Sequence, residues 1–325
     1  MRYKIIGLLG LMLGRLGHAQ QVAVPDSVGP DRIVAYSFAN DAFFRTDYYF
    51  TQGMALNVVH PLLRRSPVNR LLLGGGNGTI NYHGIKLYYD GFTPLRIQDP
   101  FIRLGDRPYA SYIYAALYRV ANSPARHQRL TSAINVGFIG PVAGAKGFQT
   151  AVHRWLDAPT PRGWDYQVRN DVVLGYQVTF EKQVAALPGV AELLGHATAS
   201  AGTLHTFAGA GPRLRVGRLN PYFENLGVTA RPRQSGLRRF QLYAQGQLEA
   251  RLVGYNAALQ GGLLRRDNPY TLSASQISRG VLRGSGGVVA AYNGFSVEAG
   301  AAYVSPEFRW ARSHRWAHLT LQVAF

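Results

Sequence analysis

The sequence contains no cysteine, so it forms neither a disulfide nor a thiolate site. Acidic residues are few, with 17 Asp and Glu against 35 Lys and Arg, and the formal net charge is +18. Beyond the N-terminal segment, no run of about 18 consecutive apolar residues occurs, which excludes a membrane-spanning helix there. A disulfide-stabilised fold, thiol chemistry and a helical membrane protein are therefore not expected.

The first 19 residues are typical of a secretory signal. Arg2 and Lys4 precede an apolar stretch too short to span a bilayer, and small residues stand near its end, before Gln20. We expect residues 1–19 to be removed and residues 20–325 to form one exported domain.

Glycine and aromatic residues are abundant, with 37 Gly, 19 Tyr and 15 Phe. This combination favours a β-barrel with aromatic girdles at the membrane interfaces. The basic charge favours anionic partners, and for an exported chain without a basic helix these are anionic lipids of an outer membrane rather than nucleic acid. An alternative for part of this charge is arginine lining a polar barrel interior.

Residues 241–252 alternate between apolar and polar side chains over their whole length. This run is long for a strand of a soluble protein, and it suits a strand with lipid on one face and a wet lumen on the other. Residues 317–325 repeat the pattern and end on Phe325, like the last strand of bacterial outer-membrane proteins. An edge strand of a soluble sandwich is the alternative, but its apolar face would invite aggregation unless the sheet closed.

The whole chain is interpreted as a closed antiparallel transmembrane β-barrel of about 12 strands with a short helix at its extracellular rim. The first, third and fifth connections then share that rim, and the third and fifth are residues 90–111 and 139–171. The connection 219–238 falls at the other end, and its basic composition predicts no specific role. The predicted strands are 32–39, 53–60, 79–90, 109–120, 129–139, 171–185, 195–204, 206–218, 239–255, 277–292, 295–304 and 316–325.

The rim helix is predicted over residues 141–156, beginning at Pro141. Its apolar stripe contains Ala145, Phe148, Val152 and Trp155, and a helix that merely caps the barrel, docked through Phe148 and Trp155, would explain this stripe. Gln149 and His153 lie one turn apart on another face of this helix.

The first connection gathers Asn40, Asp41, Asp47 and Thr51 among aromatic residues. No G-x-S-x-G or H-E-x-x-H motif accompanies it, so the usual serine hydrolase and zinc protease sites are absent. Carboxylate, carboxamide, hydroxyl and imidazole groups remain. They fit a water activated by His153, with a hard cation such as calcium held by Asp and Asn oxygens. A calcium-assisted esterase acting on lipid is the consistent interpretation, with neighbouring aromatics such as Tyr49 placed where acyl chains approach.

Four segments, NDAFFRTDYYFTQG, GDRPYASYIYAAL, GFIGPVAGAKGFQTAVHRWL and GWDYQVRND, together resemble the outer-membrane lipid A deacylase family of the LpxR type. The resemblance implies a barrel of about 12 strands that uses calcium to remove the 3′-linked acyloxyacyl chain of lipid A. By motif it places the family's Asn–Asp pair on Asn40 and Asp41, its Thr on Thr51 and its essential His on His153. It implies that His153 is the base and that Asp41, with Asn40, contributes to the metal site.

This chain departs from the family pattern at Tyr48, Phe50 and Gln52, and it has no counterpart of the family's site Lys. Arg96 or Arg103 could supply that charge with a different geometry. The expected substrate-binding residues are accordingly Gln149, Arg96, Arg103 and Tyr49.

The expected partners are lipid A or lipopolysaccharide, the outer-membrane bilayer and, during insertion, the barrel assembly machinery. Two other functions remain open at this point. One is a porin or structural barrel, which would need no cluster of Asp, Thr and His at one rim. The other is a calcium-dependent outer-membrane phospholipase, although no Ser stands in an evident nucleophile motif.

Overall fold

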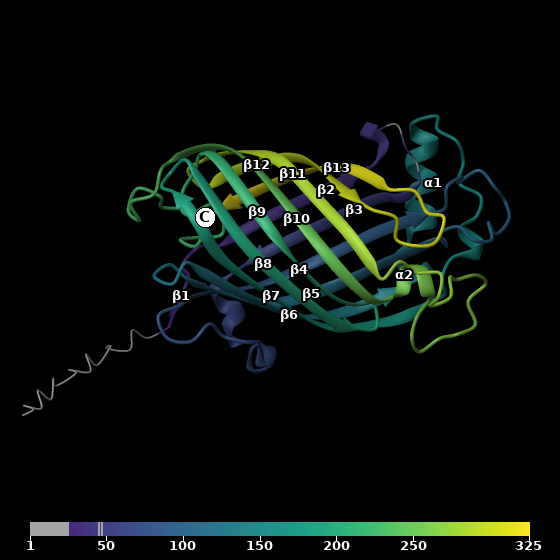
Figure 1. Cartoon of the computed structure of the whole chain (residues 1–325), viewed down its shortest axis with the longest axis horizontal. Coiled ribbons are helices and arrows are strands. Elements are labelled where there is room, and N and C mark those ends of the chain that lie inside the picture. Colours follow the sequence, from purple (N-terminus) through teal and green to yellow (C-terminus); the bar gives the residue numbers. More distant parts are fainter. Residues whose placement is uncertain (1–25, 45, 47) are drawn as a thin grey trace, which may run out of the picture.

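A computed structural model describes residues 26–44, 46 and 48–325; the expected signal of residues 1–19 and the candidate Asp47 therefore lie outside the described residues. Twelve strands, β2 to β13, wind into an antiparallel barrel that the pairing of β4 with β5 closes (Figure 1). A short strand, β1, pairs in parallel with the start of β4. The predicted barrel of about 12 strands is confirmed.

All twelve predicted strands are present, and the largest displacements are the earlier starts of β3 at Tyr49 and β8 at Ala191. Among the described residues no helix has the length and apolar character needed to cross a membrane. The strands are β1 (Ser27–Val28), β2 (Ile33–Asn40), β3 (Tyr49–Val59), β4 (Ile80–Thr93), β5 (Ala110–Ser123), β6 (Gln128–Ile139), β7 (Asp171–Leu187), β8 (Ala191–Gly202), β9 (His205–Arg218), β10 (Phe240–Asn256), β11 (Gly280–Tyr292), β12 (Phe295–Val304) and β13 (His314–Ala324). The helices are α1 (Ala145–Trp155) and α2 (Ala257–Gln260), with 3-10 turns η1 (Ala42–Phe44), η2 (Pro61–Arg65), η3 (Pro67–Leu71), η4 (Pro141–Ala143) and η5 (Trp164–Tyr166).

The two faces of the barrel wall differ in polarity, as the alternation of residues 241–252 predicts. In β10, Gln241 and Glu249 are buried inside, whereas Leu242, Leu248 and Leu252 are exposed on the outside. Large exposed apolar side chains recur on the outer face of the sheet, which matches a wall that faces lipid. Further examples are Val34, Tyr36, Leu56, Leu87, Ile113, Val136, Phe138, Leu174, Phe180, Leu214, Leu282, Val288, Leu319 and Leu321.

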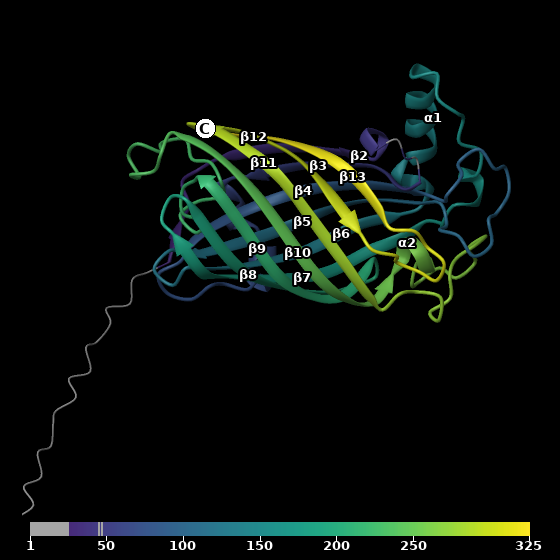
Figure 2. The ribbon, with the colours of Figure 1, turned by 45° about the horizontal axis from the view of Figure 1, so that its top comes forward.

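The connections divide between the two ends of the barrel. Figure 2 shows α1 at the end opposite to the C-terminus, on the connection 140–170. Because the strands alternate in direction, the connections 41–48, 94–109, 257–279 and 305–313 lie at the same end as α1. The first, third and fifth connections therefore share a rim, as expected.

A lid of packed side chains covers the lumen at the α1 end. Tyr49 packs there with Leu259, Leu272, Ile277 and Phe308, which come from the connections 257–279 and 305–313. Beneath this lid the buried Arg107 bonds Glu307 with an N···O distance of 2.9 Å. Burial alone would raise the pKa of Glu307, but the charge of Arg107 and other nearby cations holds that pKa below its usual value.

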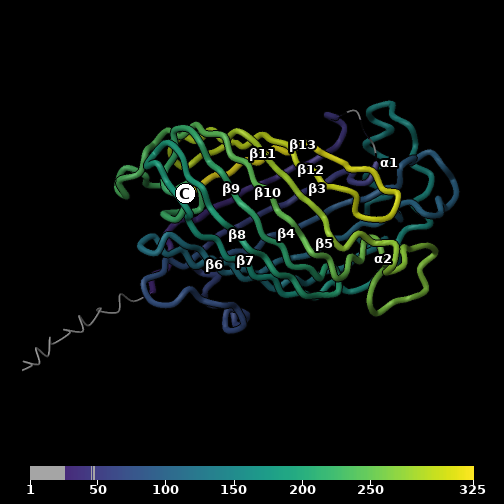
Figure 3. The backbone as a smooth tube through the Cα atoms, viewed as in Figure 1, coloured from purple at the N-terminus to yellow at the C-terminus, as the bar shows by residue number. Residues whose placement is uncertain are grey.

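A plug formed by the connection 219–239 closes the other end of the barrel, and its path can be followed from β9 to β10 in Figure 3. Val228 is buried in a cluster with Ile33, Val59 and Ala324 near the strand ends. Thr229 donates a hydrogen bond of 2.8 Å to Asp31. This connection, for which the sequence predicts no role, thus fills the barrel mouth.

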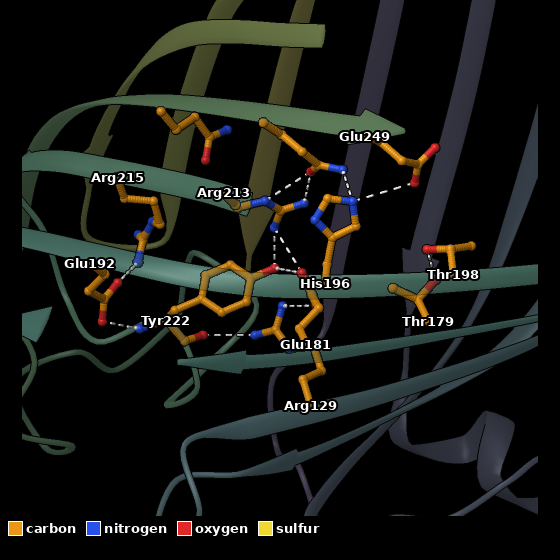
Figure 4. Close-up of polar contacts among 12 residues, drawn as sticks. Arg129, Thr179, Glu181, Glu192, His196, Thr198, Arg213, Arg215, Tyr222 and Glu249 are labelled. Atoms are coloured by element: carbon orange, nitrogen blue, oxygen red, sulfur yellow. Dashed lines mark hydrogen bonds and ion pairs between the residues drawn. The ribbon is translucent and has the colours of Figure 1, made fainter. Parts of the chain in front are cut away.

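Tyr222 anchors the plug among charged side chains in the part of the lumen next to it (Figure 4). Its hydroxyl donates to Glu181 at 2.7 Å, and the guanidinium of Arg129 lies 4.1 Å from its ring centre. Arg213 pairs with Glu181 at 3.1 Å, and Arg215 pairs with Glu192 at 2.5 Å. Each of these lumen arginines thus has a carboxylate partner, which offsets the cost of burying charge. Arginine lining the interior, the alternative for part of the basic charge, is therefore present.

Replacing residues 221–229 by a Gly/Ser segment of equal length should open this end of the lumen to water, because the plug and its hydrogen bonds would be lost while the lid still closes the other end. The chain has no cysteine, so Thr320→Cys in the cavity beside the plug gives a single labelling site. A water-soluble maleimide should label this site slowly with the native plug, and equally slowly when the exposed turn Pro61–Arg65 is replaced in the same way. Fast labelling with the native plug, or slow labelling of the plug variant, would contradict this assignment of the plug.

Candidate functional site

Two backbone irregularities at the start of β3 position Thr51. Tyr49 adopts φ 68°, which is uncommon for a residue other than glycine. The register between β3 and β4 then shifts between Phe50 and Gln52, so Thr51 is the extra residue of a β-bulge. A bulge re-aims the side chain it carries, and here it presents Thr51 to α1.

The site residues of β2 and β3 face the outside of the barrel. Ala39 and Gly53 line a lumen cavity, so their neighbours Asn40 and Gln52, which pair across the two strands, point outward. In β4, Tyr88 and Asp90 line the same cavity, and Tyr89 between them faces outward. The candidate site therefore belongs to the outer wall rather than to the lumen.

Helix α1 covers this part of the outer wall. It runs across the barrel axis and projects beyond the wall in both views (Figures 1 and 2). Ala145 packs with Tyr89 and Trp164, and the ring of Phe148 lies 6.3 Å from the ring of Tyr89. The predicted helix 141–156 is divided at Gly144, which adopts φ 78°. The 3-10 turn η4 precedes Gly144, and α1 begins after it at Ala145.

Docking of α1 through Trp155 is wrong, whereas Phe148 contacts Tyr89 of the wall. Trp155 is 83% exposed and Phe148 is 39% exposed, whereas Gln149 is only 1% exposed. The buried face contains Ala145 and Gln149, because the helix contacts the wall through a small residue and a hydrogen-bonded amide. Of the apolar stripe, Ala145 is buried in this contact, Phe148 lies at its edge and Trp155 is left outside it.

A chain of hydrogen bonds joins α1 to the bulge. The indole Nε1 of Trp164 donates to Gln149 Oε1 at 2.6 Å, and Gln149 Nε2 donates to Thr51 Oγ1 at 3.1 Å. An indole nitrogen can only donate, so it fixes which end of the Gln149 amide is the oxygen. Thr51 must then accept from Gln149, and its own hydroxyl hydrogen is left to be donated elsewhere.

Asn40 joins β2 to the same bulge. Its Oδ1 accepts from the amide of Ala42 at 2.7 Å, which turns Nδ2 toward the carbonyl of Thr51, also at 2.7 Å. The neighbouring Asp41 is buried, and its Oδ2 accepts from the amide of Tyr48 at 3.1 Å. Asn40, Thr51 and Gln149 are thus directly connected, with Asp41 beside them.

His153 lies one helical turn beyond Gln149 and is partly buried. Its Nδ1 lies 2.7 Å from the carbonyl oxygen of Pro159. Since a carbonyl only accepts, Nδ1 carries the hydrogen and Nε2 carries the lone pair of the neutral ring. The segment after α1 therefore sets the tautomer that a general base needs.

The donor set beside Asn40 fits a hard cation in ligand type. Asp41 and Asn40 supply carboxylate and carboxamide oxygens, and calcium prefers such oxygens. Within the described residues no three His, Cys, Asp or Glu side chains gather as a metal-binding group. Beside the Asp41 carboxylate, carbonyl oxygens and water would complete the shell of a cation held here.

The other predicted substrate-binding residues are not brought into this hydrogen-bonded group. Arg103 bonds Asp99 at 2.5 Å and Asp106 at 3.2 Å. These contacts raise the pKa of Arg103, and the hydrogen bond to Asp99 has the largest effect. The side chain of Arg96 is 65% exposed and lies 3.8 Å from Asp99. Tyr49 is 3% exposed and packs in the lid, where its hydroxyl accepts from the amide of Arg312.

Three contributors to the site, Trp164, Gln52 and Tyr89, are not predicted from the sequence. Trp164 lies within the GWDYQVRND segment, but only the folded chain shows that it holds Gln149. Gln52 donates to the hydroxyl of Tyr89 at 2.8 Å beneath α1. The alternation of β4 places Tyr89 outward, which could have identified it as a candidate contact for the helix.

Comparison with known proteins identifies the family. A family model described as Outer membrane protein LpxR matches residues 6–325. The chain belongs to the LpxR family. Among solved structures, LpxR from Salmonella typhimurium superposes with a TM-score of 0.73 at 19% identity, covering 90% of this chain and 100% of that one. This likeness shows the fold.

A more distant likeness is to the β domain of the Bordetella autotransporter BrkA, with a TM-score of 0.46, 11% identity and coverage of 91% of this chain and 100% of that one. No curated protein sequence matches this chain.

In this member of the LpxR family, Gln149→Leu should loosen α1 from the wall. It leaves the Trp164 donor and the Thr51 hydroxyl without their partner, at a cost of about 1–3 kcal/mol for each buried polar group. Amide hydrogen exchange in residues 145–155 should accelerate by about tenfold or more. The heat resistance of the barrel should not change. Trp155→Ala, at an exposed position of the same helix, is the control and should leave the exchange rate as in the wild type. Equal exchange rates in all three proteins would contradict the role of Gln149.

Proposed function

We propose that this chain is an outer-membrane lipid A deacylase that hydrolyses the 3′-linked acyloxyacyl ester, with the α1 end on the extracellular side. Membership of the LpxR family supports the substrate class. The observation that carries the proposal is the position of the polar site, which lies on the outer wall beneath α1 and not in the lumen. A site on that wall is reached from the surrounding lipid.

The closed lumen favours this enzyme over a porin. A lid at one end and a plug at the other leave separate internal cavities, two of which have volumes of about 270 and 200 Å³. A porin needs a continuous aqueous channel. A structural barrel, in turn, gives no reason for a buried Asp41 at the same rim as a His153 whose tautomer is fixed.

His153 is the proposed general base. Its Nε2 takes a proton from water as the water oxygen attacks the ester carbonyl carbon. The carbonyl of Pro159 holds the Nδ1 hydrogen and keeps the ring oriented throughout. When the tetrahedral intermediate collapses, the same proton passes to the departing 3′ oxygen of the sugar, and the acyl chain leaves as a free acid.

Thr51 is the proposed donor to the developing oxyanion. Its oxygen accepts from Gln149, so its hydrogen is available to the substrate. Gln149 and Trp164 hold this hydroxyl in place, while Asn40 fixes the carbonyl of the same residue. Gln149 therefore acts by positioning Thr51, and Asn40 contributes to that positioning through its side-chain nitrogen.

Calcium is the proposed cofactor, held by Asp41 and Asn40 through their oxygens. When bound, it would supply positive charge to polarise the ester carbonyl. The buried Asp41 carboxylate is positioned for that role by the amide of Tyr48.

His153→Ala should lower deacylation by about 10²–10⁴-fold, because the general base is lost. The measurement is mass spectrometry of lipid A incubated with purified, heat-modifiable protein in detergent. Arg154→Ala, an exposed neighbour on α1, should retain wild-type activity. Near wild-type turnover by His153→Ala would remove the residue from the mechanism. Loss of phospholipid acyl chains instead of a lipid A chain would indicate the phospholipase.

Chelation should stop turnover without unfolding the barrel, and calcium should restore it better than magnesium, which demands stricter octahedral geometry. Asp41→Asn keeps the size and the acceptor for Tyr48 but removes the charge, so it should weaken both the rate and the response to calcium. Asp165→Asn, an exposed partner of Lys146 near α1, is the matched control. Full activity of the wild type in chelator would reject the metal mechanism.

A further inference from the structure

Three arginines near the site have no acidic partner. Arg309, Arg312 and Arg315 are exposed on the connection 305–313 and the start of β13, and none forms an ion pair within the described part of the chain. At the same end, Arg107 and Arg265 each bond a carboxylate. Three exposed guanidinium groups within seven residues of one segment add positive charge that no carboxylate of the described residues offsets, which suits an anion.

Arg315 lies on the same outer face as the candidate site. His314 and Trp316 line the lumen cavity, so the side chain between them points outward. Ala317, two residues further along β13, pairs with Asn40 of β2. Arg315 therefore stands on the strand next to Asn40, toward the rim.

The guanidinium of Arg315 is oriented by a ring contact. It lies 4.9 Å from the ring centre of Phe44 in η1, the turn that follows Asp41. Tyr48 donates to the carbonyl of Ser313 at 3.3 Å, which joins the two connections. A stacked guanidinium keeps its N–H groups at its edge, where they can bond a second group.

The candidate site lies between Arg315 and α1. The strand order is β13, β2, β3, β4, and α1 covers β3 and β4, so Arg315 is on the opposite flank of Asn40 and Asp41. Adjacent strands are about 4.8 Å apart, which places the strand of Arg315 about 10 Å from that of Thr51. Figure 2 shows the purple turn η1 beside α1 on this side of the rim.

We propose that Arg315, stacked on Phe44, binds a phosphate monoester of the glycolipid substrate, and that Arg312 adds to the local positive charge. This inference rests on the proposed deacylase function. The lipid A sugar with the 3′ ester carries its phosphate on the adjacent carbon, so a group beside Asn40 and Asp41 suits it. Arg315 then supplies the charge expected of Arg96 or Arg103, of which Arg103 is already bonded to two carboxylates.

Arginine suits this role because its planar group can bond two phosphate oxygens at once. Simple attraction of exposed arginines to an anionic membrane would be weak, screened by salt and indifferent to which phosphate is present. A positioned phosphate contact depends instead on the 4′ phosphate of the substrate. This difference allows the two to be separated by experiment.

The test compares wild type, Arg315→Gln and Arg266→Gln on lipid A with and without its 4′ phosphate, in detergent with calcium. Arg266 is an exposed, unpaired arginine on the connection 257–279 at the same end, so its variant has the same charge change. We expect Arg315→Gln to raise KM about tenfold on the 4′-phosphorylated substrate, with little change in kcat, and to match the wild type on the substrate lacking that phosphate. Arg266→Gln should behave as the wild type on both, and Arg315→Lys should recover part of the loss.

Equal KM increases on both substrates, or equal effects of Arg315→Gln and Arg266→Gln, would overturn the proposal in favour of general attraction. Binding of lipid A micelles and of phosphatidylglycerol vesicles to the His153→Ala protein, with and without Arg315→Gln, provides a second readout that needs no turnover. Loss of binding only to 4′-phosphorylated lipid A supports the phosphate contact, and equal loss on phosphatidylglycerol contradicts it. A wild type that binds but never deacylates would reject the proposed function instead.

Discussion

The side-chain amide of Gln149 is the contact on which the outer-wall site depends. Its hydrogen bond joins helix α1 to the bulge of β3, and the side chain is almost completely enclosed. Because Trp164 donates to the amide oxygen of Gln149, the amide nitrogen must donate to Thr51. The donor and acceptor of each hydrogen bond in this series are thereby fixed. The position of His153 along the helix, one turn further on, is set by the same contact. A buried amide whose oxygen and nitrogen are both hydrogen-bonded fixes one orientation of α1 on the wall, which an apolar contact would not do.

The barrel beneath the site is filled rather than open. The lumen near the plug buries arginines, but Glu181 and Glu192 neutralise them and Tyr222 stacks among them. The α1 end is closed by apolar side chains over the Arg107–Glu307 pair. Such a paired interior adds specificity and rigidity more than net stability, since desolvating each charge offsets most of the Coulomb attraction.

The sequence predicts the barrel well because alternation with period 2 is imposed by the pleat and by the different solvents on the two faces. It predicts the positions of Asn40, Thr51 and Gln149 at one rim for the same reason, since strand direction alone assigns each connection to an end. It does not predict how α1 docks. Periodicity assigns Phe148 and Trp155 to the buried face, but at a lipid-facing wall apolar residues gain little from being covered by protein, and the polar amide of Gln149 makes the contact. The plug and the burial of Tyr49 are also missed, because both depend on long-range packing between connections that carry no periodic pattern.

The orientation of α1 has a consequence for the rate law of the proposed reaction. A helix that crosses the barrel axis and projects from the wall runs parallel to the plane of a membrane that the barrel spans. A substrate reaching the outer wall beneath it arrives by lateral diffusion in two dimensions, already oriented with its sugar at the surface and its chains in the hydrocarbon. The frequency of encounter is then governed by the mole fraction of the lipid in that leaflet and by its lateral mobility, and not by any concentration in the aqueous phase. Dilution of the substrate by other lipids would slow such an enzyme even when the total amount of substrate is unchanged.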